Sequence, residues 1–233
     1  MSTHLVKHQK MTKRQMKEDS LVTAAFHATE IWERHGTKIL IGLGAVVVVG
    51  LLAFFMSQAR TRAEQKASGD LLRASLAVSQ GDYATAAPML REIIDNAQGT
   101  DAARTAMLYL GDSFLAQKRA SEAVEWYQKY LGRAGGDRER QWIGHLALAT
   151  AYEDQGKFAE AAAAYGEAHR RAGSDNERGR AKLAQARCFL RSGQNEKALE
   201  AYREILTLPQ AGQPITDAAR GRIGELQATS PAR

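Results

Sequence analysis

One uncharged apolar run near the N-terminus constrains this chain more than any other feature of its sequence. Residues 39–56 read ILIGLGAVVVVGLLAFFM, and the uncharged stretch continues to Ala59, which makes 21 residues over 39–59. An α-helix of that length rises about 31 Å, enough to cross a hydrocarbon core of roughly 30 Å. A globular core seldom holds a helix that is apolar on every face. The run therefore predicts a transmembrane helix over residues 39–59 rather than a buried core helix.

The flanks of this run indicate how it is used. It follows 38 residues and lacks a clear small-x-small cleavage site, which favours an uncleaved signal anchor over a removed signal peptide. Seven Lys/Arg precede the run, and four lie in the first twenty residues after it. Positive loops stay cytoplasmic, so we expect the head inside and the larger part outside, although only Arg34 and Lys38 lie close to the run on the head side.

The composition limits the function classes open to the rest of the chain. Residues 60–233 are numerous enough to bury one core, and four prolines with 7% aromatic residues favour an all-helical fold. This part carries 25 Lys/Arg against 22 Asp/Glu, an excess too small and too dispersed to indicate nucleic-acid binding. Its single cysteine, Cys188, forms no internal disulfide and leaves the redox compartment open.

Four segments repeat in this larger part, with starts 37, 38 and 37 residues apart. They read ASLAVSQGDYATAAPMLREI from Ala74, GDSFLAQKRASEAVEWYQKY from Gly111, ATAYEDQGKFAEAAAAYGEA from Ala149 and ARCFLRSGQNEKALEAYREI from Ala186. Each begins with a small residue and reaches a turn centred on Gly81, Lys118, Gly156 or Gly193. Small residues allow two helices to approach closely, and glycine suits the positive φ of a helix end. The pattern predicts a stack of helix pairs.

The same positions resemble the tetratricopeptide repeat, a helix-turn-helix unit. An alanine follows each turn (Ala86, Ala123, Ala161, Ala198), and Leu90, Tyr127, Tyr165 or Tyr202 lies four residues later. The resemblance implies an α-solenoid of about four helix pairs over residues 60–208, and with the transmembrane helix predicted before it the chain is expected to be all-α. Within 209–233 we expect a capping helix that starts at Thr216 or Asp217 and ends near Gln227, then a frayed tail.

No pattern of catalytic or metal-binding residues stands out. The six histidines form no pair at HExxH spacing, and one cysteine excludes a CxxC site. Gly42-Leu43-Gly44 lies within the apolar run and lacks the Lys-Ser/Thr of a phosphate loop. Cys188 is expected to be a buried, inert thiol. We therefore expect a chain that is not an enzyme and that has no cofactor, metal site or small-molecule substrate.

Binding of a protein segment is the use that the repeat resemblance implies. In that family, fixed positions of the first helix of each pair line a concave groove. In this sequence those positions give the candidate partner-binding residues Leu108, Asp112, Leu115, Leu146, Thr150, Glu153, Asp154, Arg180, Leu183, Arg187 and Arg191. A row of leucines beside an acidic and then a basic patch suits an amphipathic helix or an extended peptide. The alternative is that the leucines only pack against the next helix.

The head, residues 1–38, offers a second contact. Asp19 or Ser20 is expected to cap an amphipathic helix that runs to about Arg34 and ends at Gly36. A helix of this kind suits a lipid surface with anionic headgroups or a partner membrane protein, and the residues leave both open. The candidate contact residues of the head are Lys13, Arg14, Lys17, Val22, Phe26 and Trp32.

The order of head, anchor and repeats resembles the bacterial family of ancillary Sec-translocon subunits. This resemblance implies a single-pass protein of the bacterial inner membrane, with a cytoplasmic N-terminus and a periplasmic repeat domain near the translocon and chaperones. The leading hypothesis is a non-enzymatic, membrane-tethered interaction scaffold in protein secretion or envelope quality control. The alternative is a structural accessory subunit of another membrane complex, bound through the head and the transmembrane helix.

Overall fold

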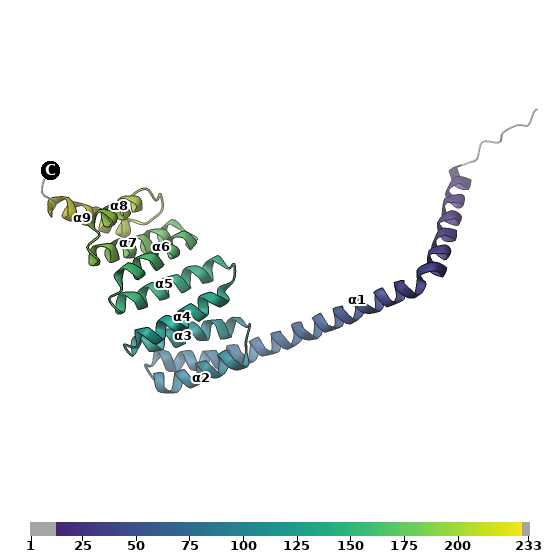
Figure 1. Ribbon diagram of the computed structural model, residues 1–233, viewed down its shortest axis with the longest axis horizontal. Helices are drawn as coiled ribbons and strands as arrows, with labels where there is room; N and C mark the ends of the chain where they lie inside the picture. Colours follow the sequence, from purple (N-terminus) through teal and green to yellow (C-terminus); the bar gives the residue numbers. More distant parts are fainter. Residues whose placement is uncertain (1–12, 230–233) are drawn as a thin grey trace, which may run out of the picture. The chain divides into compact units, whose positions relative to one another are not determined.

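The computed structural model describes residues 13–229, and of residues 13–31, 33, 39 and 229 it describes the backbone alone. The described residues form nine α-helices and no strand (Figure 1). The chain divides into two compact units, Met1–Ala59 and Arg60–Arg233, and the first helix belongs to both. The helices are α1 (Lys13–Ser79), α2 (Tyr83–Asn96), α3 (Asp101–Ala116), α4 (Ala120–Ala134), α5 (Arg138–Asp154), α6 (Phe158–Arg171), α7 (Asp175–Arg191), α8 (Asn195–Ile205) and α9 (Gln213–Thr229).

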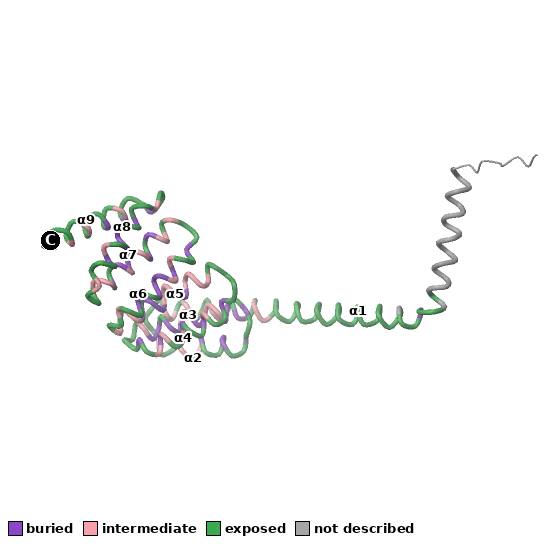
Figure 2. The backbone as a smooth tube through the Cα atoms, turned by 45° about the horizontal axis from the view of Figure 1, so that its top comes forward, coloured by how far each residue is buried: buried purple, intermediate pink, exposed green. Residues whose placement is uncertain are grey.

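The second unit is a stack of helix pairs, which confirms the predicted all-α solenoid. Residues 60–79 of α1 pair with α2, and the next pairs are α3 with α4, α5 with α6 and α7 with α8. The small residue that begins each repeat and the alanine after each turn are buried, so the two helices meet where neither has a bulky side chain. Figure 2 shows the buried residues running along the inside of this stack. Each pair covers the next, and the buried side chains form two hydrophobic clusters, one spanning Ala67 to Cys188 and one spanning Ala186 to Ala219.

The turns within the pairs have the backbone conformation that the repeat pattern predicts. Gly81, Gly156 and Gly193 have φ of 76°, 73° and 76°, and Lys118 has φ of 64° at the equivalent place. Positive φ is open to glycine without a steric cost, whereas a residue with a Cβ is disfavoured there. The second repeat thus keeps the turn and lacks the residue that suits it best.

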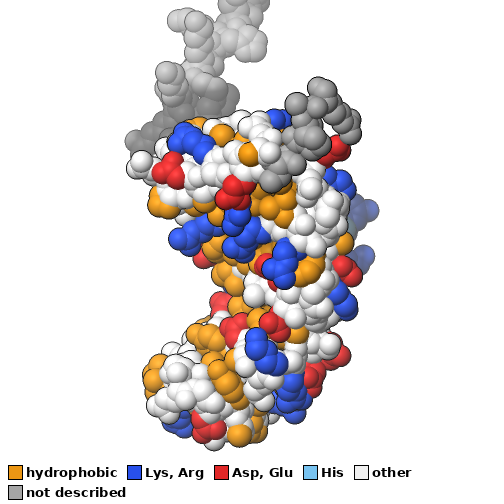
Figure 3. Space-filling view, turned by 90° about the vertical axis from the view of Figure 1, so that its left-hand side faces the viewer, with side chains coloured by type: hydrophobic (Ala, Val, Ile, Leu, Met, Phe, Trp, Pro, Cys, Tyr) orange, Lys and Arg blue, Asp and Glu red, His pale blue; other side chains and the backbone are white. Residues whose placement is uncertain are grey.

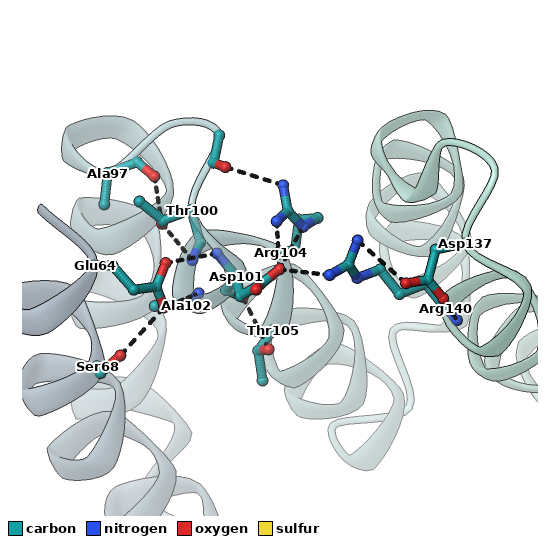
Figure 4. A network of polar contacts seen from close by, with 12 residues as sticks. Glu64, Ser68, Ala97, Thr100, Asp101, Ala102, Arg104, Thr105, Asp137 and Arg140 are labelled. Carbon is teal, nitrogen blue, oxygen red and sulfur yellow. Dashed lines mark hydrogen bonds and ion pairs between the residues drawn. The ribbon is translucent and has the colours of Figure 1, made fainter. Parts of the chain in front are cut away.

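Side chains from neighbouring repeats hold the starts of the first helices in place (Figure 4). The Glu64 carboxylate accepts the backbone N–H groups of Asp101 and Ala102 at 2.7 and 3.1 Å, so α1 caps the N-terminus of α3. The Asp101 carboxylate in turn accepts a hydrogen bond from Arg140 of α5 at 2.8 Å. An acidic group at a helix N-terminus satisfies free N–H groups and complements the helix dipole. These bonds set the register between three successive first helices.

The solenoid ends in the predicted capping helix, but that helix starts earlier than expected. α9 begins at Gln213 rather than at Thr216 or Asp217. Pro214 lies in its first turn, where the missing N–H costs no hydrogen bond. Gly212, with φ of 88°, supplies the carbonyl that accepts the Ile215 and Thr216 N–H groups. Pro209 and Pro214 therefore lie between the end of α8 and the first turn of α9, and Pro214 suits the start of the new helix.

The first unit contains the apolar run, inside α1. By length and composition, the segment Arg34–Ser79 is the one part of the described helices that suits a membrane crossing, and none of its most apolar stretch is buried. The predicted helix end at Gly36 is wrong, since α1 continues through this residue. A Cβ at Gly36 would lie 3.4 Å from the ring of Trp32, one turn earlier, which is ordinary van der Waals contact, so the ring packs beside Gly36 within a continuous helix.

Candidate protein-binding groove

The predicted groove residues lie on the accessible face of α3, α5 and α7. The helices α3, α5 and α7 bury eight, four and five of their residues, and none of the eleven predicted positions is among them. In Figure 3 the repeat stack curves around a hollow whose edge carries hydrophobic, acidic and basic side chains. We call these eleven residues the candidate groove. The structure places them on one side of successive helices, as a surface for a partner requires, and their use in binding stays a prediction.

The leucines of the candidate groove have two roles in the structure. Leu108 and Leu146 are half-buried and pack against the core of the first three repeats, and Leu183 packs in the same way against the core of the last. Their inner atoms therefore belong to the solenoid, as the alternative interpretation has it. Their outer atoms stay accessible. A leucine row of this kind offers a partner a narrow apolar strip rather than a deep pocket.

A buried tyrosine supports the groove surface in the second repeat. The Tyr127 hydroxyl donates a hydrogen bond of 2.6 Å to the carboxylate of Asp112. Burial raises the pKa of Tyr127, and the nearby Asp112 charge raises it further. Protein around the Asp112 carboxyl also raises its pKa, although the side chain reaches solvent and the Tyr127 bond opposes the shift. The tyrosine thus orients a carboxylate that faces the groove.

The third repeat has a similar arrangement at the equivalent tyrosine. The Tyr165 hydroxyl donates to the Glu153 carboxylate at 2.8 Å and lies 3.4 Å from the Thr150 hydroxyl. Burial raises the pKa of Tyr165, which stays protonated and keeps its hydrogen available as a donor. Two neighbouring repeats therefore present oriented acidic groups on the same face.

The fourth repeat reverses this polarity. Arg187 occupies the position of Asp112 and Thr150, fifteen residues before the repeat's tyrosine. The buried Tyr202 hydroxyl has no hydrogen-bond partner among the described residues, and Arg187, unlike a carboxylate, cannot accept its hydrogen. No described carboxylate lies within ion-pair distance of Arg180, Arg187 or Arg191, and the Arg191 guanidinium lies 4.7 Å from the centre of the Phe158 ring. The candidate groove is acidic on α3 and α5 and basic on α7.

Comparison with known proteins agrees with this geometry. The family model of the tetratricopeptide repeat matches residues 71–138 and 146–213, more than half of the chain. The chain belongs to the tetratricopeptide repeat family. A crystal structure of nearly identical TPR-like repeats from a kinesin light chain of Podosopora anserina is similar at 17% identity and a TM-score of 0.56, and a single-substitution form of it at 16% and 0.57. The matches cover 71% of this chain and 87% and 86% of theirs.

These likenesses carry a limited message. At such identities the solved structures show the fold alone. No curated protein matches the chain. Tetratricopeptide repeats are generally scaffolds for protein–protein interaction and are typically not enzymes. Membership in the family thus supports a binding role for the candidate groove without naming the partner.

One feature of this tetratricopeptide domain was not predicted from the sequence. No contact was predicted for the tyrosine hydroxyls, yet two of them hydrogen-bond to acidic groove residues. Asp112 lies fifteen residues before Tyr127, whereas Glu153 lies twelve residues before Tyr165, so no single spacing in the sequence predicts both contacts. Among the described residues, no group of three or more His, Cys, Asp or Glu side chains is arranged to hold a metal ion.

The head residues are described in part. Trp32 lies on α1 with its side chain 54% exposed. Lys13, Arg14, Lys17, Val22 and Phe26 fall in the same helix, but their side chains lie outside the described part of the chain. Contact of this region with lipid or with a membrane partner stays a prediction.

Proposed function

We propose that this tetratricopeptide protein is a membrane-tethered scaffold that binds a segment of a partner protein on its candidate groove. The observation that carries the proposal is the accessibility of the groove residues on a repeat stack, with oriented carboxylates on two helices and arginines on the third. Residues 39–59 serve as the tether, supported by their length, their composition and their exposure in the structure.

The charges of the candidate groove select the kind of segment that fits. Asp112, Glu153 and Asp154 favour basic side chains, while Arg187 and Arg191 favour acidic ones. Complementary charges speed encounter and fix orientation, and the leucine strip supplies apolar contact along the length. The matching ligand is an amphipathic helix or extended peptide with basic residues toward α3 and acidic residues toward α7.

The setting that the layout supports is the bacterial inner membrane, with the repeat domain in the periplasm. A head, an anchor and a tetratricopeptide domain in this order resemble ancillary subunits of the Sec translocon. The partner is then a translocon subunit, a chaperone or another envelope protein, and the work is secretion or envelope quality control. The basic head residues Lys13, Arg14 and Lys17 supply contact with anionic lipid.

The test is recovery of partners from membranes in mild detergent. We expect the tagged full-length chain to retain a defined set of proteins, and the double substitution Arg187→Glu with Arg191→Glu to reduce their recovery on the order of tenfold. The matched control is Arg170→Glu with Arg203→Glu, which makes the same change of charge at exposed positions of α6 and α8. Equal recovery with both double variants would contradict binding at the groove.

A deletion separates the scaffold from the accessory subunit. Removal of Arg60–Arg233 leaves the head and anchor in place. If the shortened chain keeps every partner, the contact lies in the head and membrane segment, and the accessory-subunit alternative holds.

A further inference from the structure

The start of the solenoid exposes apolar side chains that the rest of the repeat unit buries. Among the described residues from Arg60 onward, three large hydrophobic side chains are exposed: Leu72 at 63%, Leu76 at 53% and Leu206 at 39%. The first two lie one turn apart on α1. Exposed apolar residues that cluster in this way indicate a surface that another molecule covers.

The repeat register shows what kind of surface this is. Gly69, Leu72 and Leu76 occupy the positions of Ala106, Tyr109 and Ser113, which are buried or half-buried in α3. In α5 and α7, the first helices of the third and fourth repeats, the same three positions hold small residues that are all buried or half-buried. They are Gly144, Ala147 and Ala151 in α5, and Ala181, Ala184 and Cys188 in α7.

The three positions in α5 show how closely this helix face packs against the preceding repeat. A Cβ at Gly144 would lie 2.6 Å from Leu131 of α4, the second helix of the preceding repeat. At Gly69 a Cβ would meet nothing within 4 Å. Residues 65–76 of α1 therefore present a face that, in every later repeat, packs against a preceding helix pair. Here that face is open. We call Gln65, Gly69, Leu72 and Leu76 the open stacking face.

Charged residues beside this face indicate its occupant. A hollow of 470 Å³ between α1 and α2 adjoins the open stacking face and is lined in part by Lys66, Asp70, Arg73 and Glu92. Asp70 pairs with Arg73 of the same copy at 3.6 Å. The two positive and two negative groups give a neutral border, so two identical faces meet without net repulsion. A two-fold interface requires a self-complementary patch of this kind.

The rest of the chain offers the leucines no better partner. The other end of the stack is sealed by α9, whose described residues expose no large hydrophobic side chain. Head-to-tail stacking would therefore press two leucines onto a polar helix. A lipid surface with anionic headgroups would face Asp70 and Glu92 as well as Lys66 and Arg73, so the neutral border gives it no net attraction. The apolar surface of this unit that matches the open stacking face is the same face on a second copy.

We propose that the protein forms a two-fold dimer in which the open stacking faces of two copies, each built on Leu72 and Leu76, cover one another. The interface joins first repeat to first repeat and leaves both candidate grooves accessible. The hollow and the leucines comprise about a dozen residues a side, fewer than the 20–30 of a standard interface. The dimer is accordingly weak, and its population rises with protein concentration.

Mass measurement of the full-length chain in detergent over a range of concentrations tests the dimer. We expect a monomer–dimer equilibrium that Leu72→Glu with Leu76→Glu weakens on the order of tenfold or more in Kd. Leu206→Glu, at the third exposed leucine, should leave it unchanged. Circular dichroism checks that each variant keeps its helix content. A monomer at all concentrations, or a dimer equally strong in the double variant, would overturn the proposal.

Crosslinking locates the contact independently. In a Cys188→Ala background, Leu72→Cys should form a disulfide-linked homodimer when a thiol oxidant is added, since a two-fold axis brings the same position of both copies together. Ala218→Cys, exposed on α9, should not. When the two variants are mixed, a disulfide between position 72 of one copy and position 218 of another would indicate head-to-tail stacking. Linkage of position 72 only to a different protein would indicate a different occupant. Either result overturns the proposal. Because the partner recovery described above does not depend on this interface, each proposal can fail alone.

Discussion

Lys118 occupies a backbone conformation for which lysine is poorly suited. Its φ of 64° matches the glycine turns of the other three repeats. A residue with a Cβ in this region loses about 1–2 kcal/mol relative to glycine. The lysine side chain contributes little stabilisation in exchange. It forms an ion pair with Asp154 at 3.3 Å, but it is 82% exposed, and solvent-exposed ion pairs are weak.

Lys118→Gly should therefore stabilise the repeat unit. A gain of about 1 kcal/mol corresponds to a rise of roughly 2–4 °C in the melting temperature of a domain of this size. Thermal unfolding followed by circular dichroism measures it. Lys118→Ala removes the ion pair but keeps a Cβ, so it should show no such gain. Equal melting temperatures for the glycine and alanine variants would mean that the turn is not strained.

The carboxyl of Asp112 gives the second prediction at this scale, which concerns pH. Its pKa is raised in the folded chain, chiefly by desolvation. Below the ordinary aspartate value of about 3.9 the group is protonated in the folded and unfolded states alike. As pH rises through the folded-state pKa, ionisation costs the folded state more than the unfolded chain, so the contribution of Asp112 to stability falls.

Asp112→Asn removes that ionisation and keeps an oxygen for the Tyr127 hydroxyl. The variant should melt above the wild type at neutral pH, and the difference should shrink as pH approaches 3. Thermal unfolding of both proteins over this range provides the measurement. Carboxyls with lowered pKa, such as Asp101, contribute equally to both proteins and cancel in the difference. A difference that grows toward low pH has the wrong sign for this account.

At the scale of the helix, two glycines differ in the space that surrounds them. A Cβ at Gly111 of α3 would fall within contact distance of the Tyr127 ring, which is fully buried and held by Asp112. A Cβ at Gly132 of α4 would meet nothing within 4 Å. The first glycine permits the two helices of a repeat to approach, and the second only lowers helix propensity.

Gly111→Ala should destabilise the unit by about 1–3 kcal/mol through overpacking, while Gly132→Ala should stabilise it by up to about 1 kcal/mol. Denaturant or thermal unfolding compares the two variants with the wild type. The same chemical change thus has opposite expected signs at two helices of one repeat. A tolerated Gly111→Ala would show that the Tyr127 ring can move, which contradicts its tight packing.

Sequence reasoning succeeded for the helices wherever the repeat makes residues equivalent. The turn at Lys118 was predicted without a glycine, because three other repeats have one at that position. It failed at single boundaries. Gly36 was expected to end a helix but lies inside α1, and α9 starts at Gln213, before the expected cap. A glycine or a capping residue can occur in several structural contexts. The residues that surround it in the folded chain determine which context applies.

The candidate groove was likewise predicted in part. Its accessible positions follow from the repeat register, so the sequence was sufficient to place them on one face. The capping of α3 by Glu64, 37 residues earlier, depends on how two repeats are stacked and has no local signal. The half-burial of Leu108 likewise depends on the neighbouring helices. The sequence therefore predicts which helix face is available, and the packing determines how much of each side chain a partner can reach.

For the whole molecule, the open question is the side of the membrane on which the repeats lie. The native thiol does not answer it. Cys188 is fully buried, and burial raises its pKa to about 12, so it resists thiol reagents on either side of a membrane. Its inertness instead makes the wild-type chain a clean background for cysteines placed elsewhere.

Two exposed positions then report the topology. Ala218 lies on α9 in the repeat unit, and Arg34 lies on α1 before the apolar run. If the repeats face the periplasm, a membrane-impermeant maleimide labels Ala218→Cys in cells whose outer membrane is opened but whose inner membrane is intact, and labels Arg34→Cys only after lysis. The reverse pattern places the repeats in the cytoplasm and removes periplasmic chaperones from the possible partners. Labelling of both positions before lysis would mean that residues 39–59 do not cross the membrane, because a single crossing puts the two positions on opposite sides.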